Sequence, residues 1–246
     1  MRSTLRLIFF GCLTALPSLS LSQLHAQGVS VSAKILMSSQ QQVEEKRHKG
    51  PANTSNVVVW LVSLQPGDTK LVNPPRQATY RLVQKNKQFS PHLLVVPTGT
   101  SVEFPNEDPF FHNVFSLFNG KRFDLGLYES GTTRSVRFDR EGVSYIFCNI
   151  HPEMGAVVLA LSTPYFGVAA ANGVVVIHNV PVGSYRVNIW GESAQPSKAT
   201  EAQRIVQVST ANVDLGEIVL EKTADPMGHH KNKFGEDYPV TPTPRY

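Results

Sequence analysis

The chain has 246 residues, of which 41% are hydrophobic and 17% are charged, and its formal net charge is +4 at pH 7. This length and composition are typical of one large globular domain or two small ones. With 23 basic and 19 acidic residues, the charge balance gives no case for a nucleic-acid-binding protein. After the N-terminal region, no stretch approaches the roughly 18 apolar residues that a membrane span requires, so no integral membrane segment is expected.

Residues 1–26 are predicted to form a secretory signal peptide. Arg2 and Arg6 precede an apolar run over residues 7–16, and Ala26 is a small residue before a suitable cleavage point. The run is too short and too close to that point to be a convincing membrane span. The protein is therefore expected to be exported to the periplasm.

The sequence has two cysteines, Cys12 and Cys148. Cys12 falls in the predicted signal peptide. A lipoprotein signal with Cys12 as the lipidated residue is an alternative, although the residues before it match that pattern poorly. Cleavage after Ala26 would leave Cys148 as the only thiol, so no intramolecular disulfide could form. A lone thiol is either a small buried hydrophobe or a functional group, and its neighbours decide between these readings.

The stretch Phe147-Cys148-Asn149-Ile150-His151-Pro152-Glu153-Met154 favours metal binding. Its Cys-x2-His-x2-Met spacing lets a tight turn after a strand point Cys148, His151 and Met154 at one ion. His112, in Phe110-Phe111-His112-Asn113-Val114, would have to come from a neighbouring strand. A thiolate, two imidazoles and a thioether are the donors of a blue-copper centre, in which the Met bond is long and weak. We therefore predict a copper site built from His112, Cys148, His151 and Met154.

The motif CNIHPEM, with HNV upstream and an apolar strand at 156–161 downstream, resembles the copper loop of the cupredoxins. The short His-to-Met spacing is most similar to that of the amicyanins. The resemblance covers about residues 80–162 and implies an all-β, Greek-key cupredoxin sandwich. It also implies that the four residues named above are the copper ligands.

Two neighbours of the ligands are expected to support the site. The resemblance implies that Asn113 ties the two ligand loops together, and a polar group beside a thiolate ligand orients it and tunes its potential. Pro152 is expected to stiffen the loop after His151. Glu153 departs from the family pattern, because it places a carboxylate where a neutral residue is common.

Two aromatic and two acidic residues precede His112. Phe110 and Phe111 are either core residues that cap the sandwich or, with Pro152, an apolar rim where another redox protein docks. Glu107 and Asp108 are interpreted as solvated charges, because adjacent side chains usually point apart and both lie in a proline-bounded loop.

Residues 27–79 are expected to form an N-terminal β segment that packs on or extends the cupredoxin, or that lends strands to a second unit. It contains strand-like runs at 29–36 and 56–64, followed by a turn-rich connection over 65–79. Further strands are predicted by alternation and turn residues at 80–84, 93–96, 101–104, 112–117, 123–128, 134–138, 143–147 and 156–161.

Residues 163–222 are predicted to be a second, smaller β-sandwich unit. The segment 173–190 resembles the Pro-x-Gly hairpin of transthyretin-like and carboxypeptidase-regulatory-like domains. Its physical content is a turn at Pro181-Val182-Gly183 that joins two strands, with Tyr185, Val187 and Ile189 on one face.

The tail, residues 223–246, is rich in Pro, His, Lys and Gly without periodicity. It is predicted to be flexible or draped over the surface. His229 and His230 form a poor metal site without a third donor, and they are interpreted as solvated.

The function expected from these features is that of a periplasmic type 1 copper protein that transfers single electrons between a donor and an acceptor redox protein. Cys148 would supply the covalent path and His151 the port. No His flanks Cys148, so the His-Cys-His relay of multicopper oxidases is missing, and no enzymatic activity is predicted. One alternative is a copper-binding or adhesive β-sandwich protein with a structural or stored metal. A more remote one is a mononuclear copper enzyme, which would need an open coordination position.

Overall fold

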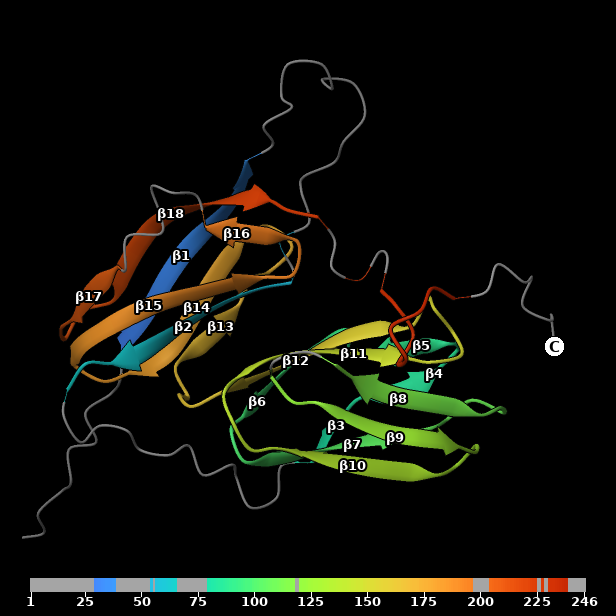
Figure 1. The fold of residues 1–246 in the computed structure, drawn as a ribbon. Helices are drawn as coiled ribbons and strands as arrows, with labels where there is room; N and C mark the ends of the chain where they lie inside the picture. The colour runs from blue at the N-terminus through green and yellow to red at the C-terminus, as the bar shows by residue number, and fades with distance from the viewer. Residues whose placement is uncertain are drawn as a thin grey trace, which may run out of the picture.

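The computed structural model describes residues 29–38, 54, 56–65, 79–117, 120–196, 204–224, 227 and 230–238. The predicted signal peptide with Cys12, most of the connection over 65–79, and His229 lie outside these residues. The described chain folds into two β-sandwiches (Figure 1) and is all-β, as the sequence predicts. It contains no helix of membrane-spanning length and hydrophobicity.

The first sandwich comprises residues 80–161. Its strands are β3 (Tyr80–Arg81), β4 (Val83–Lys85), β5 (Gln88–Ser90), β6 (Leu93–Pro97), β7 (Thr100–Pro105), β8 (His112–Ser116), β9 (Phe123–Tyr128), β10 (Thr133–Phe138), β11 (Gly142–Cys148) and β12 (Gly155–Leu161). A five-stranded sheet, β6-β12-β11-β8-β9, packs on a three-stranded sheet, β10-β7-β3, and β4 pairs with β5.

The pairing of β8 with β11 creates the position for a site. These strands are antiparallel, with Cys148 opposite Val114 and Phe147 opposite Phe115. The start of β8 therefore lies beside the end of β11, and His112 is brought next to Cys148. Side chains alternate along a strand, so Cys148 points into the core between the sheets while Phe147 points to the outer face.

The second sandwich is one curled sheet. Its strands are β1 (Val29–Ser38), β2 (Val57–Ser63), β13 (Phe166–Val168), β14 (Val174–Val180), β15 (Gly183–Gly191), β16 (Ala194–Pro196), β17 (Ile205–Val208) and β18 (Val213–Lys222). Their order is β13-β2-β15-β16-β18-β1-β14, with β17 also paired to β15. The enclosed core includes Val31, Ile35, Leu61, Ile177, Tyr185 and Leu220.

The strands of the N-terminal segment complete this second sheet. β1 lies between β14 and β18, and β2 lies between β13 and β15. The expected division treated residues 27–79 as an addition to the cupredoxin, whereas the structure follows the other possibility, that they lend strands to the C-terminal unit. β1 alternates buried and half-buried residues over its length, so it needs a core on one face, and the C-terminal strands supply that core.

The predicted Pro-x-Gly hairpin differs in the structure. β14 and β15 follow one another through Pro181, but β14 pairs with β1 while β15 pairs with β2 and β17. The turn therefore passes between distant strands of the sheet. Tyr185 fixes this corner by donating its O–H to the Pro181 carbonyl at 3.0 Å. As expected, Tyr185, Val187 and Ile189 all face the core.

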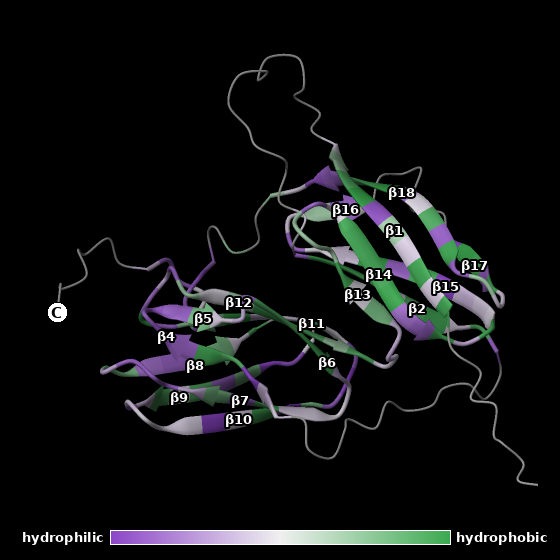
Figure 2. Cartoon of the chain, turned by 180° about the vertical axis from the view of Figure 1, so that it is seen from behind, coloured by the Kyte–Doolittle hydropathy of each residue, from purple (hydrophilic) through white to green (hydrophobic). Residues whose placement is uncertain are grey.

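The two sandwiches meet on the outer face of β12, a strand that is apolar on both sides (Figure 2). Its inward residues belong to the first core. Its outward residues Leu159 and Leu161 are buried in a third cluster with Val58, Trp60 and Trp190 of the second sandwich. At the edge of this contact, His92 Nε2 lies 2.7 Å from a Glu192 carboxylate oxygen.

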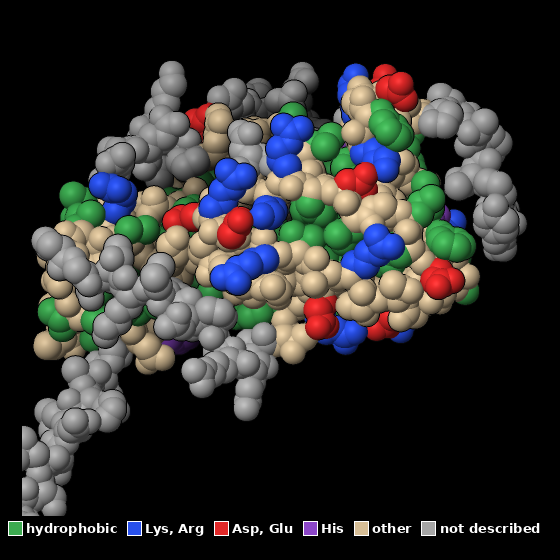
Figure 3. All heavy atoms as spheres, turned by 60° about the horizontal axis from the view of Figure 1, so that its bottom comes forward, with side chains coloured by type: hydrophobic (Ala, Val, Ile, Leu, Met, Phe, Trp, Pro, Cys, Tyr) green, Lys and Arg blue, Asp and Glu red, His purple; other side chains and the backbone are tan. Residues whose placement is uncertain are grey.

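Charged side chains of both signs lie interspersed on the face shown in Figure 3. On the first sandwich several are paired: Lys121 with Asp139 at 3.0 Å and Lys85 with Glu107 at 3.2 Å. This mixture agrees with the modest net charge of the sequence.

Candidate metal centre

Three donor atoms converge at the end of the first sandwich. Cys148 Sγ lies 3.6 Å from Nδ1 of His112 and 3.6 Å from Nδ1 of His151, and the two nitrogens are 3.2 Å apart. All three residues are buried, with exposed fractions of 0%, 0% and 8% in chain order for His112, Cys148 and His151. Together they form a group that could hold a metal ion.

The triangle of donor atoms has the size that a metal ion requires. For sides of 3.2, 3.6 and 3.6 Å, the point equidistant from the corners lies about 2.0 Å from each atom. Metal–nitrogen and metal–sulfur bonds in proteins are about 2.0–2.3 Å long. Two imidazoles and a thiolate are also the in-plane ligands that copper takes in blue-copper sites, so these residues fit copper.

The loop from Cys148 to Met154 is closed by its own backbone. Met154 N–H donates to the His151 carbonyl at 3.0 Å, and Cys148 N–H donates to the Met154 carbonyl at 3.3 Å. These bonds return the chain to β12 and bring His151 back over Cys148. Met154 is fully buried in the same apolar cluster as Cys148. Its role as the long axial ligand stays a prediction.

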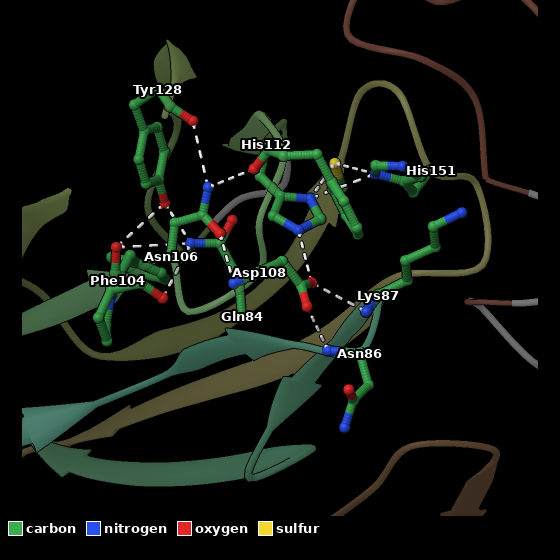
Figure 4. Close-up of polar contacts among 12 residues, drawn as sticks. Gln84, Asn86, Lys87, Phe104, Asn106, Asp108, His112, Tyr128 and His151 are labelled. Atoms are coloured by element: carbon green, nitrogen blue, oxygen red, sulfur yellow. Dashed lines mark hydrogen bonds and ion pairs between the residues drawn. The ribbon is translucent and has the colours of Figure 1, made fainter. Parts of the chain in front are cut away.

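His112 is oriented by a buried carboxylate. Its Nε2–H donates to Asp108 Oδ2 at 2.8 Å (Figure 4), so Nδ1, which lies 3.6 Å from Cys148 Sγ, carries a free lone pair. Asp108 also accepts the backbone N–H groups of Asn86 at 2.6 Å and Lys87 at 3.0 Å. A carboxylate that accepts the second N–H of a histidine is a common support of metal sites.

The interpretation of Asp108 as a solvated charge was wrong, because only 4% of its surface is exposed. The signal that could have revealed it is its position four residues before His112, in a loop bounded by Pro105 and Pro109. Glu107, in contrast, points outward and pairs with Lys85.

Burial sets the protonation of the donors. It lowers the pKa of His112, against the opposing effect of Asp108, and it lowers the pKa of His151. It also raises the pKa of the Cys148 thiol. Burial would raise the pKa of Asp108 as well, but the hydrogen bonds that it accepts hold that pKa below its ordinary value. Neutral imidazoles offer lone pairs to a metal, and the metal itself displaces the thiol proton on binding.

Burial raises the pKa of the Cys148 thiol, and the backbone N–H groups of Asn113, Ile150 and His151 partly offset that rise. Asn113 was expected to tie the two ligand loops together, and that role stays a prediction. Its side-chain amide donates to Asp124 Oδ1 on β9 at 2.7 Å. Pro152, the other expected supporting residue, has an exposed ring, and its carbonyl accepts a hydrogen bond from His230 at 2.7 Å.

The two phenylalanines before His112 have different positions. Phe110 is half-buried and packs against both ligand imidazoles, with ring centroids 5.2 Å from His112 and 5.5 Å from His151. Phe111 is exposed, with 56% of its surface accessible, and Ile150 is exposed as well, at 40%. One aromatic residue therefore covers the site, and the other contributes to an apolar surface near it.

No protein-family model matches the sequence, and no curated protein matches it. Among solved structures, it is similar to a purple cupredoxin from Nitrosopumilus maritimus, with 26% identity over 33% of this chain and 99% of that one and a TM-score of 0.31. A copper-containing nitrite reductase (NirK) from Thermus scotoductus SA-01 has 24% identity over 34% of this chain and 22% of its own, with a TM-score of 0.33. A reduced variant of amicyanin has 18% identity over 42% and 98% of the two chains, with a TM-score of 0.33.

The chain is similar to cupredoxins. Residues 80–162 have the two features that the resemblance of the loop sequence implied, a β-sandwich and a His-Cys-His group that could bind copper. The chain spans only about a fifth of the nitrite reductase.

Proposed function

We propose that this protein is a periplasmic type 1 copper protein that transfers single electrons between redox partners. The observation that carries the proposal is the convergence of His112 Nδ1, Cys148 Sγ and His151 Nδ1 in a buried triangle of metal-binding size. Copper, when bound there, would supply a one-electron couple. Export to the periplasm rests on the predicted signal peptide over residues 1–26.

The protein's contribution is to hold the donors still. Asp108 fixes the His112 ring, and two backbone hydrogen bonds close the loop that carries Cys148 and His151. Both supports come from segments held in β-sheets or closed by backbone hydrogen bonds, so the donor atoms have little freedom to move. A site that does not rearrange suits a carrier, because each electron then passes without a large structural change.

Electrons would enter and leave through His151. It is the most exposed of the three donors, and two exposed apolar side chains lie near it in the chain: Ile150 directly before it on the same loop, and Phe111 directly before His112. A redox partner with an apolar contact surface could approach the edge of His151 there. Cys148 would supply the path into the sheet, because it continues directly into β11.

The test is to load the purified protein with Cu(II) and record visible absorption and EPR spectra beside a Cys148→Ser variant. We expect an intense visible band that ascorbate bleaches and that the variant lacks. A Glu107→Gln variant, altered at an exposed residue near the site, should keep the band. A colourless protein, or a spectrum that does not depend on Cys148, would refute the copper–thiolate site.

A second measurement separates electron transfer from storage. The copper-loaded protein is reduced and reoxidised repeatedly with a soluble redox dye while the copper content is followed. A carrier should cycle with its copper retained. A protein that binds copper but loses it on reduction, or that cannot be reduced, would instead fit the alternative of a structural or stored metal.

A further inference from the structure

The described part of the C-terminal tail lies along the loop from Cys148 to Met154, called the copper loop below. Its side chains donate hydrogen bonds to backbone carbonyls of that loop. Tyr238 donates its O–H to the Cys148 carbonyl at 2.9 Å. His230 Nε2–H donates to the Pro152 carbonyl at 2.7 Å. The two contacts hold the loop at Cys148, a proposed ligand, and at Pro152, the residue after the proposed ligand His151.

Two further contacts come from the same segment. The Lys233 backbone N–H donates to Asn149 Oδ1 at 2.9 Å, and its ammonium group lies 2.8 Å from Asp124 Oδ2 on β9. Residues 230–238 therefore hold the loop and an adjacent strand together. The tail was predicted to be flexible or draped over the surface, and this part of it follows the second description through specific contacts.

The segment also covers part of the outer face of the five-stranded sheet. The second sandwich covers the outer face of β12 at Leu159 and Leu161. Nearer the metal site, Phe147 points to the same outer face and is 1% exposed. The His230 ring stacks on Phe147 with centroids 3.9 Å apart and planes inclined by 19°.

Close packing at Gly155 shows how tightly the segment approaches the loop. A Cβ atom added there would lie 2.9 Å from Met227 Sδ, so the flexible Met227 side chain would have to shift. Gly155 is the first residue of β12, directly after Met154. The Met227 side chain therefore lies against the end of the loop.

We propose that Met227 and residues 230–238 form a clamp that positions the copper loop, with Tyr238 and His230 as its positioning residues. The chain enters the clamp soon after β18 ends at Lys222, so the clamp links the second sandwich to the metal site. Part of this inference rests on the proposed copper function. The restraint of the loop does not, because it involves only the chain's own residues.

The clamp should restrain opening of the loop and so protect the Cys148 thiol. A buried thiol reacts only when the structure around it opens. Each hydrogen bond that must break during opening makes the open state rarer and so slows the reaction. The loop's own closure consists of the two backbone bonds between Cys148, His151 and Met154. The three bonds from the clamp are therefore a large part of what holds this loop.

The experiment measures the rate at which a thiol reagent modifies Cys148 in the metal-free protein, in a Cys12→Ser background. Tyr238→Phe keeps the ring and removes only the donor, and we expect the rate to rise about three- to tenfold, the factor for one ordinary hydrogen bond. His230→Phe keeps a ring to stack on Phe147 but loses the donor, and it should give a similar rise. His230→Ala loses both the stacking ring and the donor, so its modification rate should rise further than that of His230→Phe.

Lys231→Ala is the matched control, because Lys231 lies in the same segment with an exposed side chain. Its rate should stay within about twofold of the unmodified protein. Circular dichroism checks that every variant is folded. Unchanged rates in Tyr238→Phe and both His230 variants would overturn the clamp.

A second readout tests whether the clamp affects the metal site. After Cu(II) loading, Tyr238→Phe and His230→Ala should shift the visible band and the EPR parameters, while Lys231→Ala should not. Spectra identical to those of the unmodified protein would overturn the positioning role. If the protein binds no copper, the proposed function fails, but the thiol rates still decide whether the clamp exists.

Discussion

His112 Nε2–H donates to the buried Asp108 carboxylate at 2.8 Å, and this bond leaves His112 Nδ1 facing Cys148 Sγ at 3.6 Å. The carboxylate thus selects the tautomer in which the nitrogen nearest the sulfur has a free lone pair. Asp108 is held in turn by backbone N–H groups of the turn after β4. The first sandwich therefore builds its candidate metal site from two loops and a turn, in addition to the two strands.

Asp108→Asn should weaken copper binding by about 10- to 100-fold, the usual effect of losing a support of a ligating histidine. Asp108 offers two oxygens to three N–H donors, whereas an amide offers one oxygen and two more hydrogens. The NH2 group of the introduced asparagine would either face one of these N–H donors or donate to His112 Nε2, which would favour the tautomer with the proton on Nδ1. Competition with a chelator of known affinity measures the effect. Glu107→Gln is the control, and an equal loss in both variants would contradict the role of Asp108.

Met154→Leu tests the predicted axial ligand. Leucine has a similar volume, so the buried site should lose less than about 1.5 kcal/mol of folding free energy. If the thioether binds copper, its loss should leave the protein coloured, shift the visible spectrum and raise the reduction potential, because a donor to Cu(II) is removed. Voltammetry and chemical denaturation are the measurements. A spectrum and a potential equal to those of the unmodified protein would show that Met154 is only a core residue.

The parts of this structure that follow from local pattern could be predicted from the sequence. The alternation that leads to Cys148 marks β11, and the spacing of Cys148 and His151 brings two donors together within one loop. His112 could be added because the donor set and the family resemblance require it. Each of these inferences depends on residues close in sequence or on a known chemical combination.

The rest depends on contacts between distant segments, which no local pattern records. Asp108 sits in a polar, proline-bounded loop and looks solvated until Asn86 and Lys87 are folded against it. The pairing of β1 with β18 joins segments that are far apart in the sequence, with Val31 opposite Val213. The tail sequence lacks periodicity, and its described residues form no strand beyond β18, yet Tyr238 and its neighbours meet acceptors that the loop presents. In each case burial or order comes from a partner far away in the sequence.

Asp124→Asn should remove a pH-dependent contribution to stability. The pKa of Asp124 lies below its ordinary value: burial alone would raise it, but Lys233, the Asn113 amide and the Gly126 N–H favour the charged form. Its stabilising effect is therefore present above the unfolded-state pKa of about 3.8 and is lost as the pH falls through the folded-state value. Denaturation of both proteins at pH 7 and pH 3 tests this. The difference should be clear at pH 7 and smaller at pH 3, and a difference that grows on acidification would contradict it.

Leu159→Ala should destabilise the protein by about 2–5 kcal/mol. Leu159 is 1% exposed on the outer face of β12, where it packs with Val58 and Trp60 of the second sandwich. Truncation leaves a cavity between two rigid sheets, which cannot both move to fill it. Val176→Ala removes methyl groups from an exposed position of β14 and should cost no more than about 0.5 kcal/mol. The two variants are compared by chemical denaturation. If Leu159→Ala is as mild as Val176→Ala, the contact between the sandwiches contributes little to stability, and the second sandwich would have to be linked to the copper loop through the C-terminal segment alone.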